Sequence, residues 1–366
     1  MLKKKLKIFW FCLFLLCLTI GIFLVFSYWD IFIVSENDKD QSSAILTYAV
    51  SEITGIKLET RVEEIPLSGE LVESYSEVSG LAWFKDNLIF LPQYPNRMGD
   101  DDVSLIYRIP KDELLKYLLS DSQQAIKPIP IILKGDAIHW GDIKFEGYEA
   151  IVFKDQQVFL AIEARLDGEM QGYLISGSIK SDMSEIILEP ESLTETPLLL
   201  DLDNMSNEAL LFIDERLYVF YEANGNLNPD SSVLVYNMGL SFVSSINIAS
   251  LEYRITDATE VDSQNRFWVI NYFYPGEEFL KPEVDPLMEI FPEGISHQTS
   301  ENVERLVELQ YIANEINVIS KPPIQLVLQS TGEGRNWEGI VRLDDYGFLL
   351  VTDKYPRTIL GFIPYP

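Results

Sequence analysis

The chain has 366 residues, with 57 Asp or Glu against 28 Lys or Arg and a net charge of -29 at neutral pH. This acidity disfavours a nucleic-acid partner, because binding a phosphate backbone requires a basic face. The two cysteines, Cys12 and Cys17, lie in an apolar N-terminal stretch, so the rest of the chain has neither a disulfide nor a thiolate zinc site. Histidine occurs only as His139 and His297, which also disfavours a multi-histidine metal centre.

The first 29 residues have the pattern of a membrane segment. Lysines between positions 3 and 7 precede an uncharged apolar stretch over 8–26. As a helix this stretch would be about 28 Å long, enough to cross a bilayer. The lysines predict a cytoplasmic N-terminus and a periplasmic or extracellular remainder. A cleaved signal peptide is an alternative, but no small-x-small site follows the stretch; a lipoprotein site at Cys17 is another, but Leu16 precedes it where a small residue is expected.

We therefore expect a single-pass signal anchor over 1–29, a polar tether over 30–50 and a folded domain over 51–366. Within the domain, short apolar runs separated by turns predict strands. Besides the hairpins described below, the strand candidates are 56–66, 104–110, 127–133, 171–179, 184–188, 232–238, 242–248, 314–319, 324–328 and 358–365.

Two further segments interrupt this pattern of strands. A short helix is expected over 111–120. An acidic, proline-containing segment over 277–303 is either a lid over one face or a disordered insertion, and a helical turn or two is expected over 301–309.

Five segments share a more specific pattern: a polar residue, an apolar run, a polar turn, a second apolar run and another polar residue. The two polar positions are 14 residues apart in the first four segments and 15 in the last. The first positions are Ser79, Glu149, Glu208, Asp257 and Glu338; the second are Gln93, Glu163, Glu222, Asn271 and Asp353. Self-similar hairpins of this kind predict an all-β fold, a β-propeller in which each hairpin forms the inner half of a blade.

The number of blades follows from the strands between the hairpins. Each unit supplies four strands except the last, which lacks its fourth, while the strand candidate at 56–66 has no unit of its own. Pairing these two ends would close a ring of five four-stranded blades. A sixth, degenerate blade is the alternative, because the intervals between the hairpins are uneven.

The innermost strands of a propeller run in one direction, so the paired polar positions should meet on one face. Two like charges about 5 Å apart repel by roughly 3 kcal/mol at an effective dielectric near 20. Either several of these carboxyl groups are protonated or a cation is bound. Oxygen ligands favour a hard cation, and Ca²⁺ suits a flexible ring better than Mg²⁺. The predicted ligands are Ser79, Glu149, Glu208, Asp257 and Glu338; the alternative for each is a group that binds backbone N–H of a loop or a neighbouring blade.

This ordered set resembles the calcium-activated nucleotidases, the apyrase family, over residues 63–365. The resemblance rests on Ser79-Gly80-Leu81-Ala82, Glu149-Ala150-Ile151, Glu208 and Glu338-Gly339-Ile340, with Asp257 in the fourth place. It implies five blades, a preceding membrane span and an axial calcium ion bound by one residue per blade. The family carries acidic residues after its first hairpin, where this chain has Gln93-Tyr94-Pro95. The Glu149-Ala150-Ile151 and Glu338-Gly339-Ile340 motifs are also similar to those of phytase-like, esterase-like propellers, which are usually six-bladed.

Two functions stay open at this point, apart from a purely structural propeller without metal. One is a metal-dependent phosphoric ester or anhydride hydrolase, with Glu163, Glu222 or Asp353 activating water. Its phosphorylated ligand would be bound by Arg97, Arg165, Arg335 and Arg357, which lie close in sequence to the polar positions and otherwise pair with acidic neighbours. The other is a membrane-tethered propeller with a structural calcium ion, which docks a protein partner, a glycan or a small ligand on that face.

Overall fold

The computed structural model describes residues 58–99, 103–120, 124–135, 143–197, 199–200, 202, 204–353 and 355–365. The chain divides into two compact units, Met1–Ile56 and Lys57–Pro366, and the described residues belong to the second. The expected anchor, the expected tether and His139 lie outside the described residues. None of the helices in the described ranges is long and apolar enough to cross a membrane.

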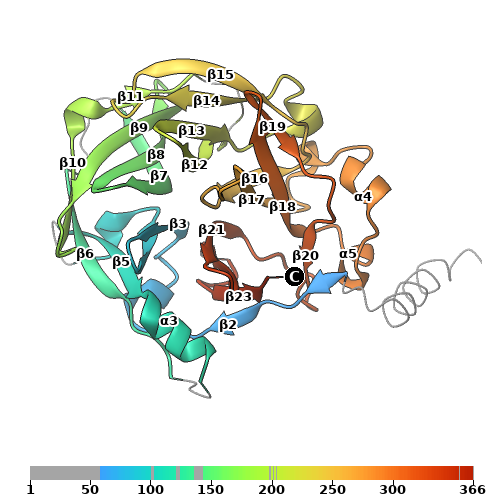
Figure 1. The fold of residues 1–366 in the computed structure, drawn as a ribbon, viewed down its shortest axis with the longest axis horizontal. Helices are drawn as coiled ribbons and strands as arrows, with labels where there is room; N and C mark the ends of the chain where they lie inside the picture. The colour runs from blue at the N-terminus through green and yellow to red at the C-terminus, as the bar shows by residue number, and fades with distance from the viewer. Residues whose placement is uncertain are drawn as a thin grey trace, which may run out of the picture. The chain divides into compact units, whose positions relative to one another are not determined.

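Five groups of four antiparallel strands surround a common centre in a β-propeller-like fold (Figure 1). Blade 1 contains β3 (Val78–Phe84), β4 (Asn87–Pro92), β5 (Ser104–Pro110) and β6 (Ile129–Lys134). Blade 2 contains β7 (Lys144–Lys154), β8 (Gln157–Leu166), β9 (Glu169–Ile179) and β10 (Glu185–Leu188). Blade 3 contains β12 (Asn207–Ile213), β13 (Arg216–Tyr221), β14 (Ser232–Tyr236) and β15 (Phe242–Ile248).

The last two blades have the same antiparallel order. Blade 4 contains β16 (Arg254–Ala258), β17 (Arg266–Phe273), β18 (Val303–Ile312) and β19 (Glu315–Val318). Blade 5 contains β21 (Trp337–Leu343), β22 (Gly347–Thr352), β23 (Leu360–Pro364) and β2 (Glu63–Ile65). The other elements are β1 (Glu59–Thr60), β11 (Thr194–Glu195), β20 (Ile324–Leu326), α3 (Lys111–Leu118), α4 (Pro286–Ile290), α5 (Ile295–Gln298) and 3-10 turns at Glu70–Val72, Pro95–Arg97, Pro190–Ser192, Gly225–Leu227 and Glu278–Leu280.

The ring closes in two ways. The innermost strands follow one another around the centre, because β3 contacts β7, β7 contacts β12, β12 contacts β16, β16 contacts β21, and β21 contacts β3. At the outer edge of blade 5, β2 pairs antiparallel with β23, with Glu63 opposite Phe362 and Ile65 opposite Leu360. The predicted pairing of the early strand with the last unit is thus confirmed.

A buried hydrophobic cluster lies at each of the five junctions between neighbouring blades. At the junction of blades 5 and 1, for example, Leu81 and Leu88 pack with Val341 and Leu349. Burying one such side chain contributes about 1.5–3 kcal/mol, so these junctions supply much of the force that holds the blades side by side. Nearly every residue of the inner strands is buried, and successive side chains point to opposite faces. Each inner strand therefore packs against both neighbouring blades.

The helical turn or two expected over 301–309 is wrong, because β18 (Val303–Ile312) is the third strand of blade 4. Two adjacent charged residues obscure the strand pattern, and both are buried with partners. Glu304 accepts a hydrogen bond from Trp337 Nε1 at 2.8 Å, and Arg305 pairs with Asp285 at 2.6 Å. Buried charges of this kind are stable in a sheet only when they are paired.

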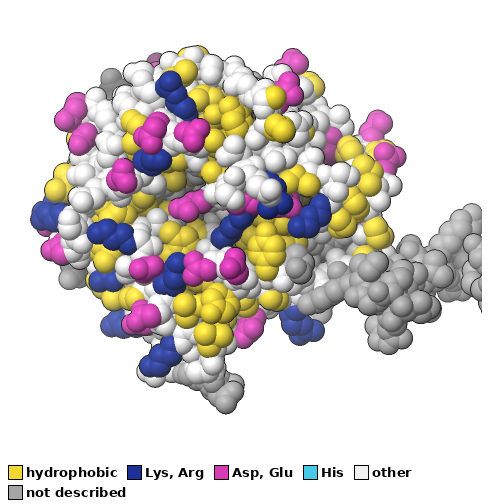
Figure 2. Space-filling model, in the orientation of Figure 1, with side chains coloured by type: hydrophobic (Ala, Val, Ile, Leu, Met, Phe, Trp, Pro, Cys, Tyr) yellow, Lys and Arg dark blue, Asp and Glu magenta, His cyan; other side chains and the backbone are white. Residues whose placement is uncertain are grey.

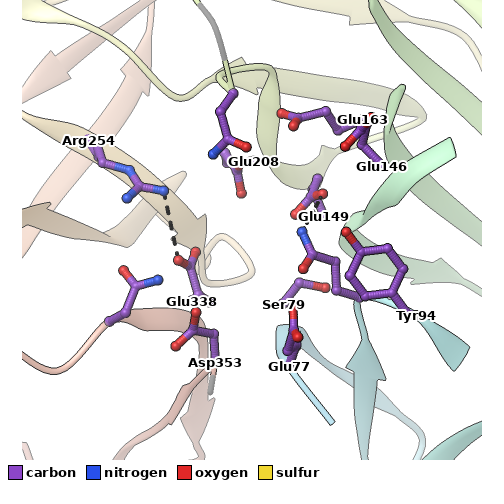
Figure 3. Close-up of a pocket in the computed structure, with 13 residues that line it drawn as sticks. Glu77, Ser79, Tyr94, Glu146, Glu149, Glu163, Glu208, Arg254, Glu338 and Asp353 are labelled. Atoms are coloured by element: carbon purple, nitrogen blue, oxygen red, sulfur yellow. Dashed lines mark hydrogen bonds and ion pairs between the residues drawn. The ribbon is translucent and has the colours of Figure 1, made fainter. Parts of the chain in front are cut away.

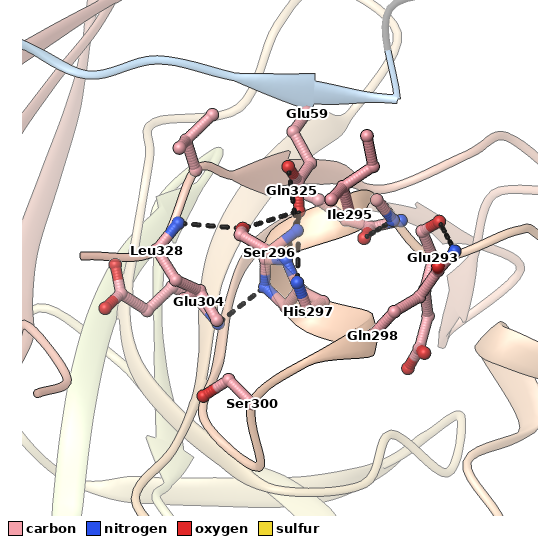
Figure 4. Close-up of polar contacts among 12 residues, drawn as sticks. Glu59, Glu293, Ile295, Ser296, His297, Gln298, Ser300, Glu304, Gln325 and Leu328 are labelled. Atoms are coloured by element: carbon pink, nitrogen blue, oxygen red, sulfur yellow. Dashed lines mark hydrogen bonds and ion pairs between the residues drawn. The ribbon is translucent and has the colours of Figure 1, made fainter. Parts of the chain in front are cut away.

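The segment between β17 and β18 forms the short helices α4 and α5 and is clasped to the start of the domain (Figure 4). The Glu59 carboxylate accepts hydrogen bonds from Ser296 N at 3.0 Å and from Ser296 Oγ at 2.6 Å. It also accepts one from His297 N at 3.2 Å and lies 2.9 Å from His297 Nδ1. Beside this clasp, β1 pairs in parallel with β20, which continues the sheet of blade 4.

Candidate functional site

The first polar position of each hairpin lies at an irregularity of the inner strand. Ser79, Glu149, Glu208 and Glu338 each occupy a β-bulge between two paired residues. A bulge leaves one residue out of the ladder and turns its side chain in a new direction. The repeated sequence spacing therefore corresponds to a repeated backbone distortion, which points these side chains toward the centre.

These side chains line a cavity of about 240 Å³ to which all five blades contribute (Figure 3). On the face shown in Figure 2, acidic and basic side chains lie around the hollowed centre of the ring. The residues that line the cavity are Glu77, Ser79, Gln93, Tyr94, Glu146, Glu149, Glu163, Asn204, Glu208, Arg254, Asn336, Glu338 and Asp353.

Six of the predicted site residues meet in this cavity. Ser79, Glu149, Glu208 and Glu338 come from the predicted metal-ligand set, and Glu163 and Asp353 come from the predicted catalytic set. All four glutamates are buried, with 4–7% of their surface exposed. The cavity is thus lined by residues from the first and from the second polar positions of the hairpins.

Two further acidic candidates do not line the cavity. Asp257 accepts hydrogen bonds from Ala258 N at 2.7 Å and, across the junction to blade 5, from Ile340 N at 2.8 Å. Burial nevertheless raises the pKa of Asp257 well above its ordinary value. Glu222 is completely buried behind the cavity, where it accepts a hydrogen bond from Arg254 Nε.

The four predicted arginines do not line the cavity either, and each has an acidic partner. Arg97 pairs with Glu77 at 3.4 Å, Arg165 pairs with Glu146 at 3.4 Å, and both partners belong to the cavity wall. The buried Arg335 pairs with Glu304 at 2.7 Å, and the exposed Arg357 pairs with Glu64. These arginines neutralise acidic neighbours and do not form a cationic lining.

Blade 4 contributes a hydroxyl group, that of Thr256, which the spacing of the polar positions does not predict. Ser79 Oγ donates a hydrogen bond to the Tyr148 carbonyl at 2.6 Å, and Thr256 Oγ1 donates one to the Trp337 carbonyl at 2.6 Å. Each of these carbonyl groups directly precedes the bulge glutamate of the next blade. Thr256 is therefore the structural counterpart of Ser79, and Asp257 is shifted by one position.

Arg254 is the second missed residue, and it lies inside the cavity wall. Its guanidinium group is 3.4 Å from Glu277 and 3.8 Å from Glu338, in addition to its bond with Glu222. The sequence does contain a pattern that includes Arg254. In three blades, the residue two positions before the hydroxyl or carboxyl side chain at the bulge is polar or charged. That position holds Glu77, Arg254 and Asn336 in blades 1, 4 and 5, and all three line the cavity.

Burial raises the pKa values of the four buried glutamates of the cavity. Burial raises the pKa of Glu149 to about 7, against a hydrogen bond from Gln93 Nε2 at 3.0 Å, and the charge of Glu222 raises it further. Burial and then the charges of Glu149 and Glu222 raise the pKa of Glu163 to about 9. Burial also raises the pKa values of Glu208 and Glu338 well above their ordinary value. The cavity therefore holds protons that an incoming cation would displace.

The donor set is suited to a hard cation, because carboxylate, hydroxyl and amide oxygens line the cavity. In the part of the chain that the structure describes, however, no three His, Cys, Asp or Glu side chains are arranged so that they could hold a metal ion. Binding an ion would therefore require the long glutamate side chains to converge from their blades.

No family model matches the chain, and no curated protein matches it. Among solved structures, a glucose dehydrogenase has a TM-score of 0.47 at 11% identity, with 83% of this chain and 99% of that chain covered. A glycosyl hydrolase from Bacteroides ovatus has a TM-score of 0.44 at 8% identity, with 85% and 94% covered. A GH43_1 enzyme from Xanthomonas citri has a TM-score of 0.40 at 11% identity, with 82% and 91% covered. Similarity at this level does not indicate a shared reaction.

Proposed function

We propose that the cavity binds a divalent cation, with Ca²⁺ as the best match, in a propeller that an N-terminal anchor holds outside the membrane. One observation carries the proposal: among the described residues lining the cavity are seven carboxyl groups and a single guanidinium group. Four of these carboxyl groups, those of Glu149, Glu163, Glu208 and Glu338, are buried, and such an excess of buried acid requires protons or a cation. Glu149, Glu208 and Glu338 would supply the ligands from three different blades. Ser79 would contribute a fourth oxygen.

The cation would also serve as the contact point for a ligand on this face. Gln93, Tyr94 and Asn336 offer hydrogen-bonding groups and an aromatic ring beside the carboxylates. A polyhydroxylated ligand can bind both a calcium ion and such groups. A phosphoric ester has less support, because Arg97, Arg165, Arg335 and Arg357 do not reach the cavity and its negative charge opposes a phosphate.

Metal removal and return test this proposal directly. The full chain, kept in a mild detergent and stripped with a chelator, is titrated with CaCl₂ while the melting temperature is recorded. We expect a rise of several degrees near millimolar Ca²⁺, since extracellular calcium modules bind at roughly 10⁻⁴ to 10⁻³ M. In weakly buffered solution at neutral pH, the same titration should release protons from the cavity glutamates.

Glu149→Gln and Glu338→Gln should each abolish most of the shift, because each removes a charged oxygen ligand. The matched control is Glu169→Gln, which changes an exposed carboxylate at the start of β9. A melting temperature that is insensitive to Ca²⁺ up to about 10 mM, with no proton release, would contradict the proposal.

A further inference from the structure

Arg254 places a positive charge in a wall that is otherwise acidic or neutral. It is the one Lys or Arg among the described residues lining the cavity, and it occupies the start of β16. Only 11% of its side chain is exposed, so water screens its charge weakly. A cation entering the cavity must therefore bind close to a guanidinium group.

The three carboxylates around Arg254 differ in how closely they bind its guanidinium group. Glu222 accepts a hydrogen bond from Nε, and Glu277, in the segment after β17, accepts one from Nη1 at 3.4 Å. Glu338 lies 3.8 Å from Nη2, which is ion-pair distance but too long for a hydrogen bond. Figure 3 shows the guanidinium group reaching from its own blade toward Glu338. The guanidinium group is thus fixed from behind and only loosely attached to the cavity carboxylate.

We infer that Arg254 is a built-in counter-ion that competes with the bound cation for Glu338 and so sets the affinity of the cavity. The inference rests on the proposed cation site and adds the residue that tunes it. The Glu338 carboxylate can either pair with the guanidinium group or bind the cation. Each of these two interactions weakens the other. The anchor on Glu222 draws the guanidinium charge away from Glu338 and thereby keeps the site available.

This arrangement predicts changes of opposite sign for two neutralising substitutions. Arg254→Gln removes the competing charge, so the dissociation constant for Ca²⁺ should fall at least about tenfold. Glu222→Gln removes the anchor behind the cavity, so Arg254 should pair more closely with Glu338 and the dissociation constant should rise several-fold. A general loss of packing would instead weaken binding in both variants.

The experiment measures the binding of Ca²⁺ alone to the full chain by calorimetry, and of Tb³⁺ by luminescence excited through the protein's tryptophans. Arg254→Lys keeps the charge and should stay within about threefold of the wild type. Arg342→Gln is the matched control: it removes an arginine from β21, the strand of Glu338, at a position outside the cavity, and should leave affinity unchanged.

Several results would overturn the inference. Equal affinity of the wild type and Arg254→Gln overturns it while leaving the cation site intact, and so does a similar gain in Arg342→Gln. If Arg254→Gln does not fold, Glu222→Gln alone decides, since unchanged or tighter binding by that variant overturns the inference. Absence of Ca²⁺ and Tb³⁺ binding in every folded variant overturns both the inference and the proposed function.

Discussion

Ser79 and Thr256 show how single side chains connect neighbouring blades. Each hydroxyl group donates to a carbonyl group of the next blade, at the residue before a bulge glutamate. Both hydroxyl groups are buried, and a buried hydrogen bond of this kind contributes about 1 kcal/mol. Since the carbonyl and the glutamate belong to adjacent residues, these bonds also fix the direction from which Glu149 and Glu338 enter the cavity.

Glu163 should make the protein less stable as the pH rises. Its pKa in the fold, about 9, lies above the ordinary value of 4.5, so the folded state binds a proton that the unfolded state releases. Its stabilising effect is complete below pH 4.5 and is lost progressively as the pH rises toward 9. In Glu163→Gln, with chelator present, the melting temperature should fall less between pH 5 and 9 than in the wild type, as differential scanning fluorimetry would show.

The control for this measurement is a substitution of a carboxylate that is exposed to solvent in the folded protein. Glu195→Gln, at the exposed end of β11, should retain the pH slope of the wild type. A slope in Glu163→Gln as steep as that of the wild type would show that other groups cause it. The remaining slope in that variant should come from the other buried carboxyl groups with raised pKa values. These include Glu149 and Glu222, whose pKa values are both about 7, together with Glu208, Asp257 and Glu338.

At the scale of elements, the segment between β17 and β18 joins two distant parts of the domain. Glu277 near its start bonds to Arg254 at the cavity, while Ser296 and His297 near its end bind Glu59 of β1. From its sequence, this segment is expected to be either a lid over one face or a disordered insertion. Its ordered contacts at both ends make it a strap, which connects the cavity wall to the strand at the start of the domain.

The strap should open in acid or after loss of the Glu59 charge. Burial alone would raise the pKa of Glu59, but its hydrogen bonds with His297 and Ser296 outweigh burial and lower it. This stabilisation is present above the ordinary value of 4.5 and is lost as the pH falls through the lowered pKa. Glu59→Gln should therefore cost about 1.5–3 kcal/mol and speed amide hydrogen exchange in α5 at neutral pH.

Glu63→Gln is the control for this measurement, because it changes an exposed carboxylate on the neighbouring strand β2. Hydrogen exchange in α5 should then match the wild type. Unchanged exchange in Glu59→Gln would show that packing, and not the carboxylate, holds the strap in place.

Strand signals in the sequence are strong where apolar residues form a run between turns and weak where charged residues are buried. Four of the hairpins and the strand Phe242–Ile248 have nearly the predicted bounds, whereas the first strand of the fourth hairpin, β16, ends at Ala258, where its apolar run was expected to begin. The strand β18 was missed because Glu304 and Arg305 interrupt its pattern, and their partners come from distant segments. Pairing between distant residues is set by the fold, which a local pattern does not report.

The cavity was predictable to a similar degree. The equal spacing of the polar positions correctly predicted that Glu149, Glu208 and Glu338 meet, because each of them occupies the same kind of bulge. Blade 4 differs, since two residues, Thr256 and Asp257, lie between its paired positions. Because of this local irregularity, the residue equivalent to Ser79 is Thr256 and not Asp257, and Arg254 enters the cavity wall. The spacing of polar residues in the sequence does not predict such an irregularity.

At the scale of the whole molecule, the closure of blade 5 should control cooperative unfolding. Deleting residues 58–66 removes β1 and β2 and exposes the edge of β23. We expect a lower and broader melting transition and concentration-dependent association, because an open strand edge pairs with other chains. Differential scanning calorimetry and light scattering would detect these two effects.

The double substitution Glu63→Ala and Glu64→Ala is the control, since both side chains are exposed and the strand backbone is kept. It should unfold almost as the wild type does. A cooperative, monomeric protein after the deletion would show that the contacts among the inner strands close the ring without β2.

The pairing of β2 with β23 also separates the order of the chain from the order of the blades. Residue Glu63 lies opposite Phe362, so an early strand of the domain and its last strand are adjacent in one sheet. Neighbouring strands are about 5 Å apart, a gap that a short linker can bridge. A circularly permuted chain, opened at the exposed turn between β9 and β10, would therefore keep every strand pair of blade 5 and make its seam covalent. In this ring, the break in the chain between β23 and β2 thus lies at a position that the packing does not require.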